Sequence, residues 1–264
     1  MLKIQNLTKI FFPGTVYENI VLRNINLNVD KSEFVTIIGG NGAGKSTLLN
    51  SIAGVFPIEQ GSIEINGENV VHAPEYQRAH LIGRVFQNPL QGTAASLTVE
   101  ENLAIAALRG KHRRLRLAVT EPRRKEFREK LSFLGLGLES RLKEQVGLLS
   151  GGQRQALTML MATMARPQLL LLDEHTASLD PKTAEQIIFL TKKLVSEYQL
   201  TTLMVTHNME QALIFGNRTI MMHQGEIIFD IRGREREKMT VKDLLEKFNE
   251  VRKEKLAEDR MLLT

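Results

Sequence analysis

Cysteine and tryptophan are absent from this sequence, and aromatic residues make up only 5% of its 264 positions. Without cysteine the chain can form neither a disulfide nor a thiolate metal site, which fits a reducing compartment. So few aromatic rings give poor support for a platform that stacks single-stranded nucleic acid. No apolar run reaches the roughly 20 residues of a membrane-spanning helix, and Met1–Asn6 lacks the apolar core of a signal peptide. We therefore expect a chain that does not cross a membrane and has no nucleic-acid partner.

The remaining composition is that of an ordinary globular protein, with 42% hydrophobic and 25% charged residues. The length suits one large α/β domain, or such a domain with an inserted subdomain. The net charge of +5 indicates an anionic neighbour, and it leaves open whether this is nucleic acid, lipid headgroups or a bound nucleotide.

One glycine-rich stretch fits the phosphate-binding pattern G-x-x-x-x-G-K-[ST]. The apolar run Phe34–Ile38 before it predicts a buried parallel strand, and Ser46–Ala53 after it predicts a helix that ends at Gly54. Glycines let backbone N–H groups turn toward a phosphate, while Lys45 reaches the β and γ phosphates and the Ser46 hydroxyl ligates magnesium. The predicted phosphate and magnesium site comprises Gly39, Gly40, Asn41, Gly42, Ala43, Gly44, Lys45, Ser46 and Thr47.

Strand patterns flank the glycine-rich stretch on both sides. Residues 25–29 alternate apolar side chains with asparagine, and residues 61–67 repeat the alternation and end in the hairpin signal Asn66-Gly67. A second hairpin is predicted around Gln224-Gly225. These patterns predict an antiparallel β subdomain beside the nucleotide-binding strands.

Two acidic residues follow a continuous apolar run. Leu169–Leu172 predicts a buried parallel strand that places Asp173 and Glu174 at the carboxyl edge of a sheet, where α/β proteins bind ligands. A further strand, Leu203–Thr206, ends at His207. We therefore expect these three polar side chains near the glycine-rich stretch.

Helix patterns dominate residues 88–165, which we interpret as an inserted α-helical subdomain. Thr98 is expected to cap one helix, and further helices are predicted over Lys125–Leu134 and Ala156–Ala165. A charged helical tail is predicted over residues 240–264. Within the subdomain lies a basic cluster, whose interpretation as a solvated face, a lipid-headgroup contact or a contact to a phosphate backbone stays open. The cluster consists of Arg109, Lys111, Arg113, Arg114, Arg116, Arg123, Arg124, Lys125 and Arg128.

With Leu149-Ser150-Gly151-Gly152-Gln153, the chain resembles the ATP-binding cassette (ABC) ATPase family, whose motifs occur here in the family's order over essentially the whole chain. The resemblance implies one ABC ATPase domain over residues 1–264. Its α/β fold would have a P-loop NTPase core with a mixed or parallel sheet, an antiparallel β subdomain and an inserted α-helical subdomain. It also implies hydrolysis of ATP with Mg²⁺ as cofactor.

The resemblance implies a role for each motif residue. Glu174 is expected to be the general base, and His207 the switch histidine near the γ-phosphate. Gln87 is expected to sense magnesium and the attacking water, and Asp173 to hold magnesium with Ser46. The remaining expected nucleotide contacts are Ser150, Gly151, Gly152, Gln153 and Asp180.

An aromatic ring ahead of the glycine-rich stretch is a candidate to stack on the purine. The spacing favours Phe11 over Phe12 and Tyr17, and the alternative is an aromatic residue of the core or of a sheet face.

The resemblance also implies partners. A second copy of the chain would close Ser150–Gln153 over bound ATP, which gives a head-to-tail dimer with two ATP molecules in its interface. Separate transmembrane permease subunits would hold the dimer at the cytoplasmic face of the plasma membrane. An importer with an extracytoplasmic solute-binding protein is favoured, because many exporters of this family fuse cassette and spanning domain. Residues 174–177, Glu-His-Thr-Ala, resemble importers of small solutes such as amino acids, and the solute itself stays open.

Two departures from the family pattern concern the subgroup rather than the ATPase chemistry. His175 stands where the family usually has proline, and residues 154–156 read Arg-Gln-Ala instead of the commoner Arg-Gln-Arg. The alternative functions are a soluble ABC ATPase in nucleic-acid or cofactor-assembly work, the cassette of a split exporter, and a phosphate-loop kinase. The kinase alternative leaves Leu149–Gln153 unexplained.

Overall fold

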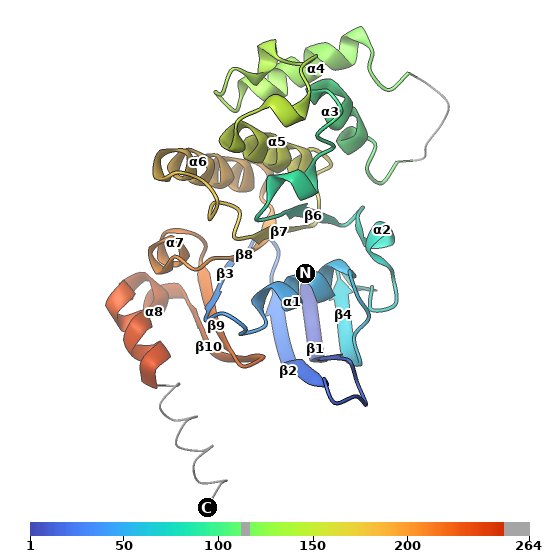
Figure 1. Ribbon diagram of the computed structural model, residues 1–264. Helices are drawn as coiled ribbons and strands as arrows, with labels where there is room; N and C mark the ends of the chain where they lie inside the picture. The colour runs from blue at the N-terminus through green and yellow to red at the C-terminus, as the bar shows by residue number, and fades with distance from the viewer. Residues whose placement is uncertain (112–116, 251–264) are drawn as a thin grey trace, which may run out of the picture.

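The computed structural model describes residues 1–111 and 117–250, which form two β-sheets with helices packed around them (Figure 1). The larger sheet has the strand order β10-β9-β3-β8-β7-β6, and all its neighbours pair in parallel except β10 with β9. The smaller sheet, β2-β1-β4-β5, is antiparallel. The predicted fold class is confirmed. The strands are β1 (Leu2–Phe11), β2 (Asn19–Val29), β3 (Phe34–Gly39), β4 (Gln60–Ile65), β5 (Glu68–Asn69), β6 (Ile82–Val85), β7 (Leu169–Asp173), β8 (Thr201–Val205), β9 (Arg218–His223) and β10 (Glu226–Arg232).

Helices lie along the larger sheet, and a separate helical layer with α3 and α4 stands at the top of the view (Figure 1). Residues 88–165 contain this layer together with α5. The α-helices are α1 (Lys45–Ala53), α2 (Glu75–Arg78), α3 (Val99–Ala107), α4 (Glu121–Ser132), α5 (Gly151–Met164), α6 (Pro181–Tyr198), α7 (Met209–Ile214) and α8 (Gly233–Lys238). Three 3₁₀ helices are η1 (Pro89–Gly92), η2 (Leu138–Ser140) and η3 (Val146–Leu148). Residues 241–250 are also helical.

Strand β7 shows why its sequence is apolar without interruption. Leu169 and Leu171 face one hydrophobic core together with α1 and the antiparallel sheet, whereas Leu170 and Leu172 face a second core with α5 and α6. All four side chains are fully buried. A strand covered on both faces needs apolar residues at every position, which explains the absence of alternation.

The helical region confirms one predicted cap and corrects two helix starts. Thr98 caps α3 through a capping box, in which its hydroxyl accepts from the Glu101 N–H and the Glu101 carboxylate accepts from the Thr98 N–H. Helix α4 begins at Glu121 instead of Lys125, because proline at position 122 is tolerated in the first turn, where no N–H partner is needed. Helix α5 begins at Gly151 instead of Ala156, since Ser150 caps it.

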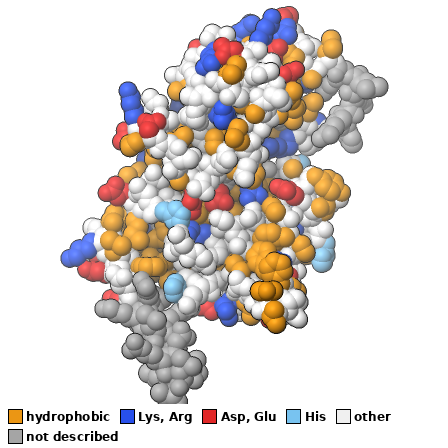
Figure 2. Space-filling model, viewed as in Figure 1, with side chains coloured by type: hydrophobic (Ala, Val, Ile, Leu, Met, Phe, Trp, Pro, Cys, Tyr) orange, Lys and Arg blue, Asp and Glu red, His pale blue; other side chains and the backbone are white. Residues whose placement is uncertain are grey.

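Basic side chains gather at the top of the view, over the helical layer (Figure 2). Lys125 and Arg128 of α4 are exposed, as expected of a solvated face. Arg124 instead bonds the nearly buried carboxylate of Glu100, with its Nε 2.8 Å from Oε2, and thereby joins α4 to α3. Three members of the predicted basic cluster, Arg113, Arg114 and Arg116, lie outside the described residues.

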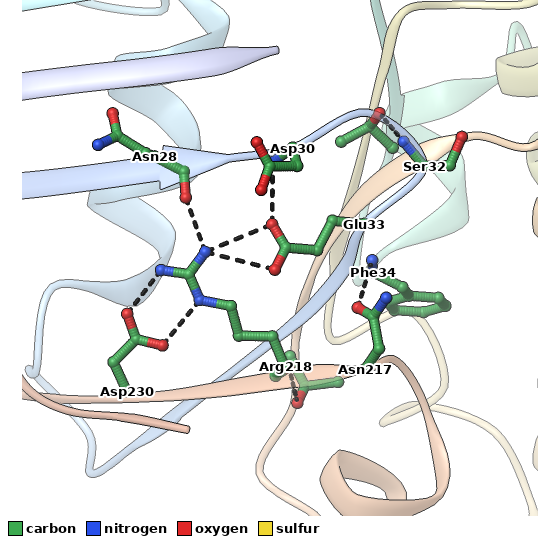
Figure 3. A network of polar contacts seen from close by, with 10 residues as sticks. Asn28, Asp30, Ser32, Glu33, Phe34, Asn217, Arg218 and Asp230 are labelled. Carbon is green, nitrogen blue, oxygen red and sulfur yellow. Dashed lines mark hydrogen bonds and ion pairs between the residues drawn. The ribbon is translucent and has the colours of Figure 1, made fainter. Parts of the chain in front are cut away.

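A buried arginine holds the two sheets together (Figure 3). Arg218, the first residue of β9, is 7% exposed and donates to the backbone oxygen of Asn28 at the end of β2. Its guanidinium also bonds both carboxylate oxygens of Asp230 on β10, at 2.7 and 2.6 Å, and lies 3.3 Å from a carboxylate oxygen of Glu33. One side chain thus fixes the antiparallel sheet, the β2–β3 turn and the edge strand β10 relative to each other.

Candidate nucleotide-binding site

The glycine-rich stretch forms a tight turn between β3 and α1, as predicted. Gly39 has φ 152°, and a Cβ placed on it would lie 2.2 Å from the Met222 carbonyl oxygen of the neighbouring strand β9. Gly44 has φ 96° and would bring a Cβ to 2.9 Å from Leu22 and from the Val21 oxygen. Only glycine fits both places, so the backbone N–H groups of the turn can face inward at the start of α1.

Lys45 is folded back onto the turn that precedes it. Its side chain is buried, and Nζ donates to the carbonyl oxygens of Gly39 at 2.9 Å and Gly40 at 3.0 Å. Burial lowers the pKa of Lys45, whereas the nearby carboxylates of Glu174 and Asp173 act to raise it. The ammonium group is therefore held in place before any phosphate arrives, at the start of a helix whose dipole also favours an anion.

Ser46 and Asp173 bring two oxygen ligands together although they lie 127 residues apart in the sequence. The Ser46 hydroxyl donates to Asp173 Oδ1 at 3.2 Å. Burial raises the pKa of Asp173, the hydrogen bond from Ser46 lowers it, and the neighbouring Glu174 raises it. One hydroxyl and one carboxylate fit Mg²⁺, which binds one or two protein oxygens and completes its shell with phosphates and water.

Glu174 and His207 face each other above the glycine turn. His207 Nε2 lies 2.5 Å from Glu174 Oε1, and the two residues follow the adjacent parallel strands β7 and β8. Glu174 has φ 46°, in the left-handed region that non-glycine residues seldom adopt. Its N–H donates to the Val205 oxygen at 3.1 Å, which holds this conformation. The sequence prediction that these polar residues share a site with Lys45 and Ser46 agrees with this geometry.

Lys45, Ser46, Glu174 and His207 line a hollow of about 240 Å³, whereas Gly39, Gly40 and Asp173 lie outside its lining. It receives side chains from the ends of β3, β7 and β8, because the carboxyl ends of neighbouring parallel strands meet at one edge of a sheet. The lining residues are Val21, Asn41, Gly42, Ala43, Gly44, Lys45, Ser46, Thr47, Glu174 and His207.

Gln87 and Phe11 do not line this hollow. The Gln87 side chain is exposed, and its backbone oxygen accepts a hydrogen bond from the Ser178 hydroxyl at 3.3 Å. The Phe11 ring is half-buried and packs edge-on against Phe56, with ring centres 5.3 Å apart. The ring therefore takes part in packing, which is the alternative left open by the sequence, while Tyr17 at the end of the β1–β2 connection is 77% exposed.

Ser150–Gln153 form a second, separate surface. Ser150 and Gly151 are exposed at the start of α5, whereas the Gln153 side chain is used within its own chain by Arg141 and by the Leu136 oxygen. Asp180 caps α6 by accepting from the Thr183 N–H at 3.1 Å, and the residue before it, Leu179, lies 3.5 Å from a Cβ placed on Gly151. The sequence predicted both motifs as nucleotide contacts, yet within the described chain neither lines the hollow that holds Lys45.

Two contacts behind the glycine turn were missed by the sequence interpretation. The Gly225 N–H donates to the Ala43 oxygen at 3.2 Å, and the Arg23 N–H donates to the Gly225 oxygen at 2.9 Å. The β9–β10 turn thus supports the phosphate-binding turn from behind and ties it to β2. The sequence predicted only a hairpin at Gln224-Gly225, because local sequence patterns do not indicate which distant residues a turn contacts.

The fold and this site define a phosphate-loop nucleotide-binding protein. The family model described as ABC transporter matches residues 22–177. A tyrosine transport ATP-binding protein of Clostridioides difficile (strain R20291) is 45% identical over 249 residues, covering 94% of this chain and 98% of that protein. A phosphonates import ATP-binding protein of Ruegeria sp. (strain TM1040) is 37% identical and covers 87% of this chain and 88% of its own. The chain therefore belongs to the ABC transporter family, and it is an ATP-binding, ATP-hydrolysing subunit of that family.

Solved structures agree with this assignment. The ATP-binding cassette MJ0796, a dimer in a post-hydrolysis state bound to ADP and Pi, superposes with a TM-score of 0.75 at 33% identity and covers 88% of this chain and 98% of its own. The cbiO1 protein of Clostridium perfringens, part of the ABC transporter complex cbiONQ, has a TM-score of 0.73 at 26% identity and covers 94% of both chains. Within residues 1–111 and 117–250, none of the helices combines the length and apolarity required to cross a bilayer.

Proposed function

We propose that this chain energises a binding-protein-dependent importer of a small solute such as an amino acid. It works as a pair of copies with two ATP molecules between them, at the cytoplasmic face of the plasma membrane. The 45% identical relative carries the name of a tyrosine transport protein, which supports an amino acid as solute. Separate permease subunits and an extracytoplasmic solute-binding protein complete the system.

The observation that carries this proposal is the division of the motif residues between two surfaces. Lys45, Ser46 and Glu174 line one hollow, while Ser150 and Gly151 are exposed at another edge of the chain. Free backbone N–H groups at the start of a helix favour binding of an anion. Because the chain already has a phosphate turn for its own ATP, this second helix start is available for the ATP of another copy. A second copy arranged head to tail places each exposed edge over the other copy's ATP.

The site residues divide the chemistry of ATP hydrolysis among them. Lys45 moves its hydrogen bonds from the Gly39 and Gly40 oxygens to the β and γ phosphates. Ser46 and Asp173 would hold Mg²⁺, and Gln87 would join them in the paired state. When bound, this ion neutralises charge on the β and γ phosphates. Glu174 accepts a proton from the attacking water, and His207 orients Glu174 through the bond to Oε1.

A groove on the helical side supports docking of a permease segment. It has a volume of about 1140 Å³ and lies between α2 and α3, close to the η1 turn that follows Gln87. Tyr76 and Ile105 on its walls are 77% and 57% exposed, and Arg109 Nη1 is buried with no hydrogen-bond partner among the described residues. Exposed apolar side chains beside this unpaired donor suit an apolar segment that carries an oxygen acceptor.

The test has two parts. First, the Glu174→Gln variant is expected to bind ATP without turnover and to dimerise in Mg²⁺ and ATP by light scattering, with Lys45→Ala as the monomeric control. A monomer at saturating ATP would contradict the paired site.

Second, the tagged chain is purified from detergent-solubilised membranes, and its partners are identified by mass spectrometry. A stoichiometric, very hydrophobic partner supports transport, and proteoliposomes with that partner then separate the solute classes. ATPase activity stimulated by an amino acid with its binding protein is expected, whereas stimulation by a phosphonate would refute the amino-acid assignment. Recovery of soluble proteins or nucleic acid alone would refute transport.

A further inference from the structure

His175 follows Glu174, but its side chain points away from the nucleotide hollow. The imidazole is 2% exposed, and its Nε2 lies 3.0 Å from the hydroxyl of Thr191 on α6. Thr191 is fully buried, and its hydroxyl hydrogen is already donated to the Ile187 oxygen at 2.8 Å. A threonine hydroxyl has one hydrogen, so His175 must be the donor, with its proton on Nε2.

This hydrogen bond fixes one side of the strained Glu174. The residue has φ 46°, an unfavourable conformation that persists only where neighbours enforce it. Its N–H is bound by the Val205 oxygen, and its own oxygen accepts from the Ala177 N–H at 2.9 Å. The next side chain along, His175, is bound to α6. Strand β8 and helix α6 thus hold Glu174 from two directions.

Helix α6 also touches the exposed edge formed by Ser150–Gln153. A Cβ placed on Gly152 would lie 2.2 Å from the Thr183 methyl group, so α5 and α6 meet there without space. Thr183 and Thr191 are eight residues apart on α6, about 12 Å along a rigid helix. The same helix therefore contacts both the edge that a second copy would use and the residue beside the general base.

We propose that His175 is a positioning residue whose hydrogen bond to Thr191 fixes the Glu174 carboxylate relative to α6, so that the general base follows the movement of the Gly152 edge. The inference rests on the proposed function, since it presupposes that the Gly152 edge closes over ATP. Neither His175 nor Thr191 lines the nucleotide hollow. Loss of their hydrogen bond is therefore expected to change catalysis rather than nucleotide affinity.

Four single variants and one double variant of the full chain test it. Thr191→Val keeps the side-chain shape and removes the acceptor, while Thr191→Ser is the matched control that keeps it. His175→Ala removes the donor, and His175→Gln restores an N–H near the same place. The measured quantities are kcat and KM for ATP hydrolysis, together with the Kd of a fluorescent ATP analogue.

Thr191→Val and His175→Ala are expected to lower kcat about tenfold, because a small displacement of a catalytic group has effects of this order, with Kd changed less than about twofold. Thr191→Ser and His175→Gln should keep most of the wild-type kcat. The Thr191→Val/His175→Ala double variant should be no slower than either single variant, since both remove one interaction.

Two results would overturn the inference while leaving the proposed function intact. One is equal kcat for Thr191→Val and Thr191→Ser in a chain whose wild type hydrolyses ATP. The other is additive losses in the double variant, which would indicate two independent packing defects. A wild-type chain without ATPase activity would instead refute the proposed function.

Discussion

Removing Arg218 is expected to destabilise the fold strongly without changing the nucleotide site. Arg218→Met leaves the Glu33 carboxylate, 8% exposed, without its cation. Loss of one partner of a buried ion pair costs about 3–5 kcal/mol. In this variant Glu33 still accepts the hydrogen bond from the Asp30 N–H at 2.9 Å, and water can hydrate the Asp230 side chain, which is 38% exposed. We therefore expect a loss of stability at the lower end of this range, about 3 kcal/mol.

Urea unfolding followed by circular dichroism measures this free energy. A loss of about 3 kcal/mol is a large share of the roughly 5–15 kcal/mol that stabilise a typical domain. Lys242→Met is the matched control, since it removes the same charge from an exposed pair with Glu246 at 3.7 Å, and we expect a change below about 0.5 kcal/mol.

A double variant, Arg218→Met/Glu33→Gln, should recover part of the loss because no buried charge remains unpaired. Arg218 is the first residue of β9, whereas Met222, near the other end of this strand, is the residue that pairs with Gly39 of the phosphate turn. The substitution is therefore remote from the nucleotide site, and the Kd for ATP should stay within about twofold of wild type. The reasoning would be refuted if Arg218→Met were as stable as the Lys242→Met control.

Three further changes test other parts of the structure. Lys45→Ala should weaken ATP binding at least about tenfold in a fluorescent-analogue assay, and unchanged affinity would contradict the phosphate-turn assignment. Gly152→Ala should cost about 2 kcal/mol in urea unfolding by pressing on the Thr183 methyl, and adding Thr183→Ser should restore stability if that contact is the cause. Burial lowers the pKa of His175 to about 4 from 6.5, so the unfolded chain binds the extra proton as pH falls through this window and stability falls with it. From pH 7 to 5, wild type should lose about 2 kcal/mol more than His175→Gln, and equal losses would contradict the burial of a neutral imidazole.

Local patterns predicted most elements because each pattern carries its own physical cause. The β7 run Leu169–Leu172 has no polar residue to expose, and Thr98 followed by Glu101 makes a capping box. The sequence interpretation missed β6 (Ile82–Val85), since a four-residue strand containing glycine and arginine lacks a periodic signal. It also missed α2, α7 and α8, which are too short to show a helical period.

By itself, the sequence determined the phosphate turn, the acidic pair after β7 and the histidine after β8, because these depend on residue types and their immediate neighbours. Only the tertiary structure decided which of them meet: Ser46 bonds Asp173 across 127 residues, while Ser150 stays at another edge. It also decided that His175 bonds Thr191 and that Gly225 supports Ala43. Such contacts depend on which strands lie side by side and which helices cover them, and this order results from packing the whole chain around its cores.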